Sequence, residues 1–362
     1  MGLVVAGRPD GIGTRLLTIL CARRFAERIG YDFRFTWPSL HEKHYDYSAN
    51  LLQKDDFFEI FARERIFADT EGEFGSLADT AILDGHRVLS ILGAYGRTWT
   101  TTAARFREDS ASYDVILYDH PTILRFDDEG LDAGDAALKA YWNRIRWNRD
   151  VEEAYRCFAA TSQLATSPAI HMRRGDIVAM IHEADFDYLR SRGITVIFQR
   201  YLPVSTAFRE LREKVPAAKN VVICSEDRGI PALFEAEFPG VAFHTSFGMF
   251  DDFGSKKALL DLMILAGCHD LISPFKSYYS ECAASVGSCR LTRSDLDVFA
   301  LARELGAIID GSAAPNKTAL KALVLVFAWR NLWHCPDLPE RANLLEASRA
   351  LDPELTRELL DA

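Results

Sequence analysis

The sequence lacks the features that mark secreted, membrane-spanning and metal-cluster proteins. Its seven cysteines form no Cys-x-x-Cys pair, so neither a disulfide framework nor a cysteine zinc site is expected. The longest apolar runs, such as 323–329, are too short to cross a membrane. No basic region precedes the apolar start, and no internal repeat or low-complexity segment is present. These absences predict a protein of the cytoplasm, with reduced thiols and no integral membrane segment.

Positive charge is also in short supply. Lys and Arg number 42 against 52 Asp and Glu, which gives a formal net charge of -10. A surface of this sign repels a phosphate backbone, so no nucleic-acid partner is expected. A phosphate-bearing small molecule needs only a local cluster of cations, which the overall charge does not exclude.

What the sequence does contain is an alternation of short apolar runs with helical segments. In the first half, residues 3–6, 31–37 and 113–118 are typical of strands. A glycine-rich turn at 7–13 leads to a helix that Thr14 can cap. In the second half the predicted strands are 169–173, 220–224, 241–244 and 271–272, and the predicted helices are 204–215, 227–238, 256–267 and 279–286. Alternation at this spacing predicts βαβ units with parallel strands and right-handed crossovers.

The length of 362 residues exceeds one ordinary core. We therefore predict an α/β fold of two Rossmann-like, doubly wound domains. The boundaries expected are 1–163 for the first domain, 164–298 for the second, and 299–362 for a helical C-terminal extension.

Residues 169–177 read Ala-Ile-His-Met-Arg-Arg-Gly-Asp-Ile and concentrate charge where a predicted strand ends. Ligands of parallel sheets bind outside the carboxyl ends of the strands. Alternation places His171 and Arg173 on the face opposite to Ile170 and Met172. A guanidinium matches phosphate oxygens, and Asp176 can hold one arginine in position. The alternative is an arginine–aspartate pair that only ties down a loop.

Two further strand ends carry polar groups. Ser225, Glu226 and Asp227 follow the strand 220–224, and the segment 273–280, Ser-Pro-Phe-Lys-Ser-Tyr-Tyr-Ser, opens another helix. The hydroxyl and carboxylate groups could simply cap helices, but they could also contact a ribose or a base. A helix N-terminus suits a pyrophosphate. Three such ends around one crevice predict a nucleotide site.

These segments resemble the motifs of the fucosyltransferase superfamily, which includes nodulation, α-1,6-, α-1,2- and protein O-fucosyltransferases. Residues 171–176 look like its His-x-Arg-x-Gly-Asp motif, and 223–227 resemble a strand that ends in Ser-Asp-Asp. Residues 258–277 resemble a third motif, in which a helix and a Cys-Asp pair lead into a serine-rich loop. Residues 11–16, Gly-Ile-Gly-Thr-Arg-Leu, are similar to the amino-terminal Gly-Leu-Gly-Asn-Arg-Leu.

The resemblance implies a GT-B fold with an acceptor domain, a nucleotide-sugar domain and a cleft between them. It also implies an inverting glycosyltransferase of polysaccharide biosynthesis that moves fucose from GDP-fucose to a hydroxyl of a glycan or glycoconjugate, with no cofactor and no required metal. Arg173 would contact the diphosphate and stabilise the leaving GDP, and His171 would support it. The donor-binding residues predicted are Gly11, Gly13, Arg15, Arg174, Asp176, Ser225, Glu226, Asp227, Ser273, Phe275, Lys276 and Ser277.

Departures from the motifs keep two alternatives open. Thr14, Glu226 and Pro274 stand where the family usually has Asn, Asp and Ser. They motivate a transferase of the same fold that uses another nucleotide sugar, or a non-catalytic module whose helical extension contacts a partner. The pair His41 and His44 and the pattern Asp185-Phe-Asp187 suggest metal sites, but the first lacks a third ligand and the second is too short to be specific.

Overall fold

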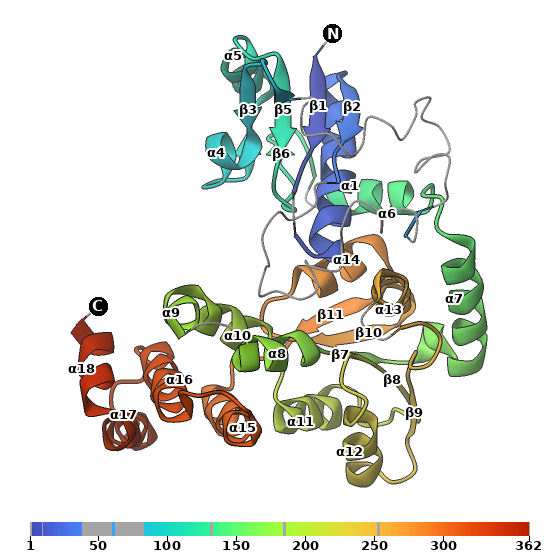
Figure 1. Cartoon of the computed structure of the whole chain (residues 1–362). Helices are drawn as coiled ribbons and strands as arrows, with labels where there is room; N and C mark the ends of the chain where they lie inside the picture. Colours follow the sequence, from blue (N-terminus) through green and yellow to red (C-terminus); the bar gives the residue numbers. More distant parts are fainter. Residues whose placement is uncertain are drawn as a thin grey trace.

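The computed structural model describes residues 2–8, 10–37, 60–61, 83–130, 133–183, 186–251 and 254–361. Two main parallel sheets lie in its upper and lower parts, residues 100–101 and 125–126 form a two-stranded parallel sheet, and helices end the chain at one side (Figure 1). The strands are β1 (Leu3–Ala6), β2 (Asp32–Phe35), β3 (Val88–Ser90), β4 (Thr100–Thr101), β5 (Val115–Tyr118), β6 (Arg125–Phe126), β7 (Ala169–Met172), β8 (Asn220–Ser225), β9 (Ala242–His244), β10 (Asp270–Ser273) and β11 (Arg290–Arg293). The helices up to the second sheet are α1 (Ile12–Ile29), α4 (Ile91–Tyr95), α5 (Ala103–Ser110), α6 (Ala133–Trp142) and α7 (Arg149–Ser162). The later helices are α8 (Gly175–Glu183), α9 (Phe186–Tyr188), α10 (Ile194–Arg200), α11 (Val204–Lys214), α12 (Ile230–Glu237), α13 (Ser255–Gly267), α14 (Tyr278–Val286), α15 (Val298–Gly311), α16 (Lys317–Asn331), α17 (Pro339–Leu351) and α18 (Pro353–Asp361).

Both sheets have the doubly wound order. The first runs β2-β1-β5-β3 and the second β11-β10-β7-β8-β9, with every pairing parallel. In each sheet the chain starts in an inner strand, builds outward on one side, and then crosses to the other side. The predicted α/β fold class, with parallel sheets and a helical end, is confirmed.

The main core lies between the two sheets. Helices α13 and α14 of the second sheet pack against α1, α6 and α7 of the first half, and Figure 1 shows them between the sheets. Their buried residues form one hydrophobic cluster with the facing side of each sheet. The far side of the second sheet is covered by α11 and α12 in a separate cluster. The two halves therefore share one core.

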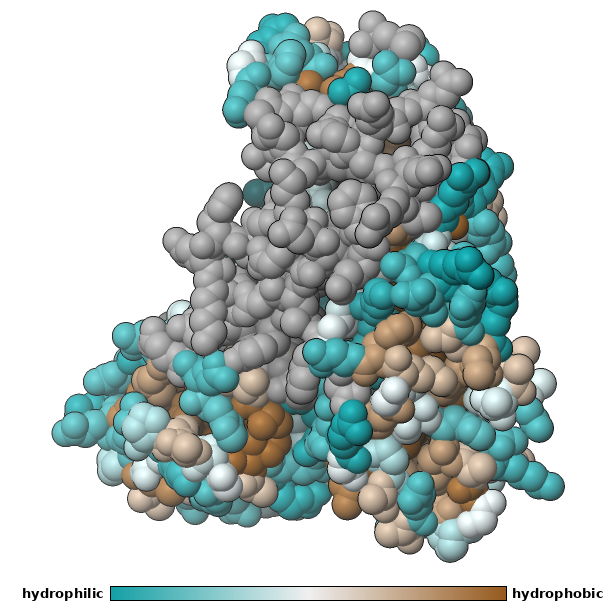
Figure 2. All heavy atoms as spheres, turned by 45° about the vertical axis from the view of Figure 1, so that its right-hand side comes forward, coloured by the Kyte–Doolittle hydropathy of each residue, from teal (hydrophilic) through white to brown (hydrophobic). Residues whose placement is uncertain are grey.

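The C-terminal helices have a core of their own. Helices α15 to α18 pack on one another and on α8 to α10, with buried residues such as Leu305, Leu323 and Leu355. Figure 1 shows them beside the second sheet, away from the first. No helix in the described ranges is long and apolar enough to span a membrane. Figure 2 shows hydrophobic side chains in patches among hydrophilic ones over the lower half of one face.

Several predicted elements differ in detail. The first helix begins at Ile12 with Gly11 as its N-cap, so Thr14 is not the cap but a buried residue of the first turn. The segment that leads to the second sheet holds two helices, α6 and α7. Trp142, the last residue of α6, and Trp147 are buried with their ring centroids 4.5 Å apart, so they pack in the core. Strand β11 was not predicted. The domain boundaries 1–163, 164–298 and 299–362 stay predictions.

Candidate functional site

The second sheet reverses its strand order between β7 and β10. Helix α11, which follows β7 in the chain, packs on one face, and α14, which follows β10, packs on the other. The elements on either side therefore diverge at the carboxyl ends of these two strands. At such a reversal α/β proteins bind ligands in a crevice, and we call this edge of the second sheet the crevice. Arg173 directly follows β7, and the loop 273–277 directly follows β10. The structure thus brings these two predicted segments to one place.

His171 lies on the face of β7 that the alternation predicts. Ile170 and Met172 belong to the cluster on the far side, while the buried His171 ring contacts Tyr279 of α14. Its Nδ1 is 2.8 Å from the Oγ of Ser280. Burial, together with the charge of Arg173, lowers the pKa of His171 from 6.5 to about 3. The ring is neutral at physiological pH and can only orient neighbours by hydrogen bonding.

Arg174 is held by contacts within the protein. Its guanidinium lies 3.3 Å from Asp227 and 3.4 Å from Glu304 of α15, and it lies over the ring of Tyr201. Its backbone N–H donates to Glu226 (3.3 Å). The alternative of an arginine that ties down a loop therefore describes Arg174. The side chain of Asp176 lies outside the described residues.

The polar groups after β8 form a turn. The Oγ of Ser225 accepts from the N–H of Asp227 (3.1 Å), and Asp227 accepts from the N–H of Gly229 (2.8 Å). Helix α12 begins only at Ile230, so the predicted start at Asp227 was too early and neither residue caps it. The turn places Glu226 and Asp227 next to the exit of β7, since β8 is the neighbouring strand.

The loop after β10 presents two side chains outward and keeps two hydroxyls inside. Ser273 and Ser277 are buried, and Ser277 caps α14 by accepting from the N–H of Ser280 (3.3 Å). Phe275, 45% exposed, and Lys276 lie on the surface. The backbone N–H of Lys276 donates to the carbonyl of Gln199 (2.9 Å), which fixes the loop. An exposed cation and a helix N-terminus thus lie on the loop that follows β10, the strand next to β7.

The glycine motif of the first half joins the two halves. A Cβ on Gly13 would lie 2.6 Å from the Cα of Tyr279, so only glycine allows this approach of α1 to α14. Arg15 is buried: its Nε donates to the carbonyl of Asp10 (2.6 Å) and its guanidinium lies over Trp37. Gly13 and Arg15 therefore hold the motif against the second half.

Sequence reasoning missed the corresponding edge of the first sheet. Its strand order reverses between β1 and β5, where Arg8 donates to the carbonyl of Asp119 (2.9 Å) and pairs with Asp10 (3.3 Å). His120 follows, with its ring 5.9 Å from that of Tyr278 in α14. The Asp-His pair after the predicted strand 113–118 was a visible signal, but its significance depends on a strand order that the sequence does not reveal.

A buried charge pair lies under the turn after β8. The Nζ of Lys257 donates to Asp261 (2.5 Å), and Ser246 donates to the same carboxylate. Burial lowers the pKa of Lys257, but the charge of Asp261 outweighs it and the pKa is raised. No pattern indicated this pair, because Lys257 stands next to Lys256 at a helix start. Within the described ranges no group of three or more metal-ligating side chains occurs, and His41, His44 and Asp185 lie outside those ranges.

No protein-family model matches the chain, and no curated protein matches it. Solved structures do. A NodZ alpha-1,6-fucosyltransferase soaked with GDP-fucose is 15% identical, with a TM-score of 0.46 over 79% of this chain and 92% of that chain. Fucosyltransferase NodZ from Bradyrhizobium is 14% identical, with a TM-score of 0.46 over 79% and 93%. POFUT1 in complex with GDP-fucose is 14% identical, with a TM-score of 0.41 over 81% and 98%. The three structures named here are those of fucosyltransferases, the superfamily whose motifs the sequence resembles.

Proposed function

We propose that the chain is an inverting glycosyltransferase that moves fucose from GDP-fucose to a hydroxyl of a glycan or glycoconjugate. The observation that carries the proposal is the convergence at the reversal point of the second sheet. Arg173 follows β7, and the loop with Lys276 and the N-terminus of α14 follow the neighbouring strand β10. Two of the four sequence motifs that resemble the superfamily, 171–176 and 258–277, supply these groups.

The chemistry follows from the charge at this edge. In an inverting transfer the acceptor oxygen forms a bond to the anomeric carbon, and the bond from that carbon to the diphosphate oxygen breaks with its electron pair on GDP. The hydroxyl proton leaves to water. Negative charge grows on the leaving diphosphate, so a guanidinium that contacts it is worth more in the transition state than in the ground state. Arg173 has this role in the proposal, and the neutral His171 orients the exit of β7 through Ser280.

One observation supports a different base on the nucleotide. Glu226 replaces the first aspartate of the second motif, and its carboxylate is engaged by the backbone of Arg174. A transferase with another nucleotide sugar is therefore the second candidate.

A thermal-shift panel with GDP, UDP, ADP and GDP-fucose separates these candidates, because a ligand that binds the folded state raises its apparent stability. We expect shifts with GDP and GDP-fucose and none with UDP or ADP. A shift with UDP alone would be consistent with the same fold class, but would show that the donor is a UDP-sugar rather than GDP-fucose. No shift with any nucleotide, in protein that unfolds cooperatively, would favour the non-catalytic module.

A further inference from the structure

A cavity of about 480 Å³ lies between the two halves, beside the crevice. Its walls come from α1, the segment 98–100, the segment 121–125 and α6 on one side, and from α14 and β11 on the other. This volume falls within the roughly 300–1,000 Å³ of small-molecule sites. None of the predicted donor-site residues lines it, so it is a separate feature of the molecule.

Trp99 lines this cavity with a backbone that its side chain does not favour. Its φ is 52°, in the left-handed region, where a bulky residue is an outlier. The conformation is fixed from both sides, because the N–H of Trp99 donates to the carbonyl of Tyr95 (2.9 Å) and its carbonyl accepts from the N–H of Arg125 (3.1 Å). Strain of this kind is retained where it positions a functional side chain. Here it holds a half-buried indole at the wall of the cavity.

The rest of the lining mixes apolar and polar side chains, and its charges are balanced. The apolar residues are Leu17, Pro121, Ile123, Leu138, Ala284 and Leu291. The charged side chains are two cations, Arg125 and Arg293, and two anions, Asp135 and Glu281, and the hydroxyls of three threonines join them. Arg293 pairs with Glu281 at 3.3 Å. A cavity without net charge does not select a phosphate or a carboxylate. An indole face beside donors and acceptors of both kinds matches a neutral sugar ring, whose C–H face is apolar and whose rim is hydroxylated.

A row of rings connects the cavity to the crevice. The ring of Trp99 is 4.6 Å from that of His120, and His120 is 5.9 Å from Tyr278, the residue after the loop 273–277. The Nδ1 of His120 accepts the N–H of Thr122 (3.2 Å), so the proton of the neutral ring is on Nε2. Burial and the charge of Arg8 lower the pKa of His120, which keeps the ring neutral. The row therefore offers an N–H donor between the cavity and the donor loop.

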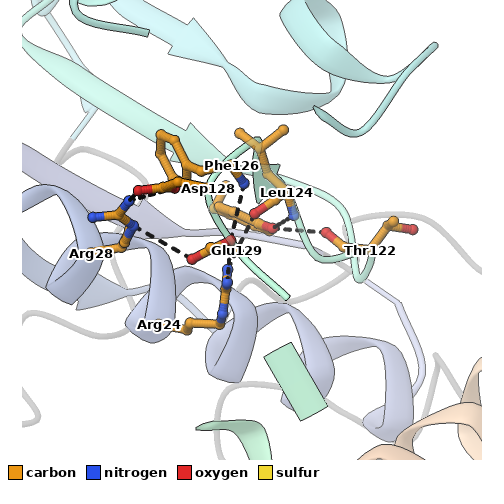
Figure 3. Close-up of polar contacts among 8 residues, drawn as sticks. Arg24, Arg28, Thr122, Leu124, Phe126, Asp128 and Glu129 are labelled. Atoms are coloured by element: carbon orange, nitrogen blue, oxygen red, sulfur yellow. Dashed lines mark hydrogen bonds and ion pairs between the residues drawn. The ribbon is translucent and has the colours of Figure 1, made fainter. Parts of the chain in front are cut away.

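The segment 121–125, which follows His120 and lines the cavity, is anchored to α1 through the residues around it (Figure 3). Arg24 of α1 donates to the carbonyl of Leu124 (3.2 Å) and pairs with Glu129 (2.5 Å), and Arg28 pairs with Asp128 (2.5 Å). The hydroxyl of Tyr118 donates to the carbonyl of Thr122 and accepts from the N–H of Leu124, so it links two residues of the segment 121–125. A fixed wall favours binding, because little conformational freedom is lost when a ligand enters.

We propose that this cavity binds the acceptor of the transfer, with a neutral pyranose ring stacked on Trp99. The acceptor role rests on the proposed function, whereas sugar binding by the cavity does not. Trp99 is then a specificity-determining residue, and His120 donates to the sugar at the side of the crevice.

The test uses the full chain and four neutral disaccharides: maltose, cellobiose, lactose and N,N′-diacetylchitobiose. Saturation-transfer-difference NMR reports which of them contacts the protein and gives its Kd. The variants are Trp99→Gly, which suits the left-handed backbone and removes the indole, Trp99→Phe, which keeps an aromatic face, and Trp333→Ala, a control at a tryptophan that is 75% exposed in the C-terminal helices. The thermal shift with GDP is measured on every sample.

We expect at least one disaccharide to bind the wild type, about a tenfold weaker Kd in Trp99→Gly, partial recovery in Trp99→Phe and no change in Trp333→Ala, with an unchanged GDP shift. No signal from any of the four sugars, in protein that still shifts with GDP, would overturn the inference and leave the proposed function standing. A sugar signal that Trp99→Gly does not weaken would overturn it as well. Loss of the GDP shift in all samples would instead reject the proposed function. A sugar signal that depends on Trp99 would even then show that the cavity binds a sugar.

Discussion

At the scale of single residues, burial decides what the histidine of the central motif can do. His171 was expected to support Arg173, and a charged imidazole could do so by attracting phosphate. Within the core its pKa falls to about 3 because water is excluded and Arg173 is near. His171 therefore contributes no positive charge to this edge, which leaves that role to arginine and lysine side chains, with Arg173 next to it in the chain.

This burial predicts a pH dependence of stability. Between about pH 6.5 and pH 3 the unfolded chain binds a proton at His171 that the folded chain does not, so the free energy of unfolding falls as the pH falls. An His171→Asn variant keeps a hydrogen-bonding group near Ser280 but does not titrate. From about pH 7.5 to about pH 5.5 we expect this variant to lose about 1.4 kcal/mol less than the wild type, by urea unfolding at each pH. Equal losses in both proteins would show that His171 is accessible to protons when folded.

At the scale of elements, the contact between α1 and α14 couples the two halves at the site. Gly13 and Tyr279 meet where the first turn of α1 approaches the first turn of α14. The loop 273–277 directly precedes α14, so a shift of this helix moves the loop. The glycine motif thus acts on the donor loop through packing, and its direct contact with a donor stays a prediction.

A Gly13→Ala substitution is expected to destabilise the protein by about 1–3 kcal/mol, because the new Cβ has no space and the helices must separate. Urea unfolding midpoints measure the effect. The matched control is Gly306→Ala in the middle of α15, where an added Cβ meets nothing within 4 Å. That change should stabilise by about 0.5–1 kcal/mol, since alanine favours helix. A Gly13→Ala protein as stable as the wild type would contradict the packing described here.

Helix α15 connects the C-terminal helices to the exit of β7. The carboxylate of Glu304 accepts from the hydroxyl of Tyr201 (3.1 Å) and the N–H of Val204 (3.1 Å), and it pairs with Arg174 (3.4 Å). These contacts hold the start of α11 and the arginine loop together. The extension is therefore part of the site's support.

For Glu304→Gln we predict a loss of about 1–3 kcal/mol in the free energy of unfolding, because the amide satisfies fewer donors and leaves Arg174 with less compensating charge. The midpoint of denaturant unfolding is the readout. Glu340→Gln in α17, at an exposed position, is the control and should change the midpoint little. An equal change of the unfolding midpoint in the two variants would contradict the connection between α15 and the site.

At the scale of the whole molecule, the sequence predicted most strands of both sheets because each is a short apolar run between turn residues. It also placed His171 on the correct face of its strand, since alternation is local. The sequence could not predict where the strand order reverses, and so it missed Asp119, His120 and the cavity with Trp99. The ion pair between Arg174 and Glu304 could not be predicted either, because the two residues are 130 positions apart in the sequence. Long-range packing, which no local pattern encodes, accounts for both omissions.

The central claim is that a guanosine diphosphate binds at the reversal point of the second sheet, on Arg173. Calorimetric titration of GDP tests it directly, with Arg173→Ala and with Arg212→Ala as a control at an exposed arginine of α11 that pairs with Glu237. We predict binding by the wild type, unchanged affinity in Arg212→Ala, and at least about a tenfold loss in Arg173→Ala, because a charge-assisted contact to the diphosphate is removed. Equal affinity in all three proteins, or no binding of GDP to the folded wild type, would contradict the claim.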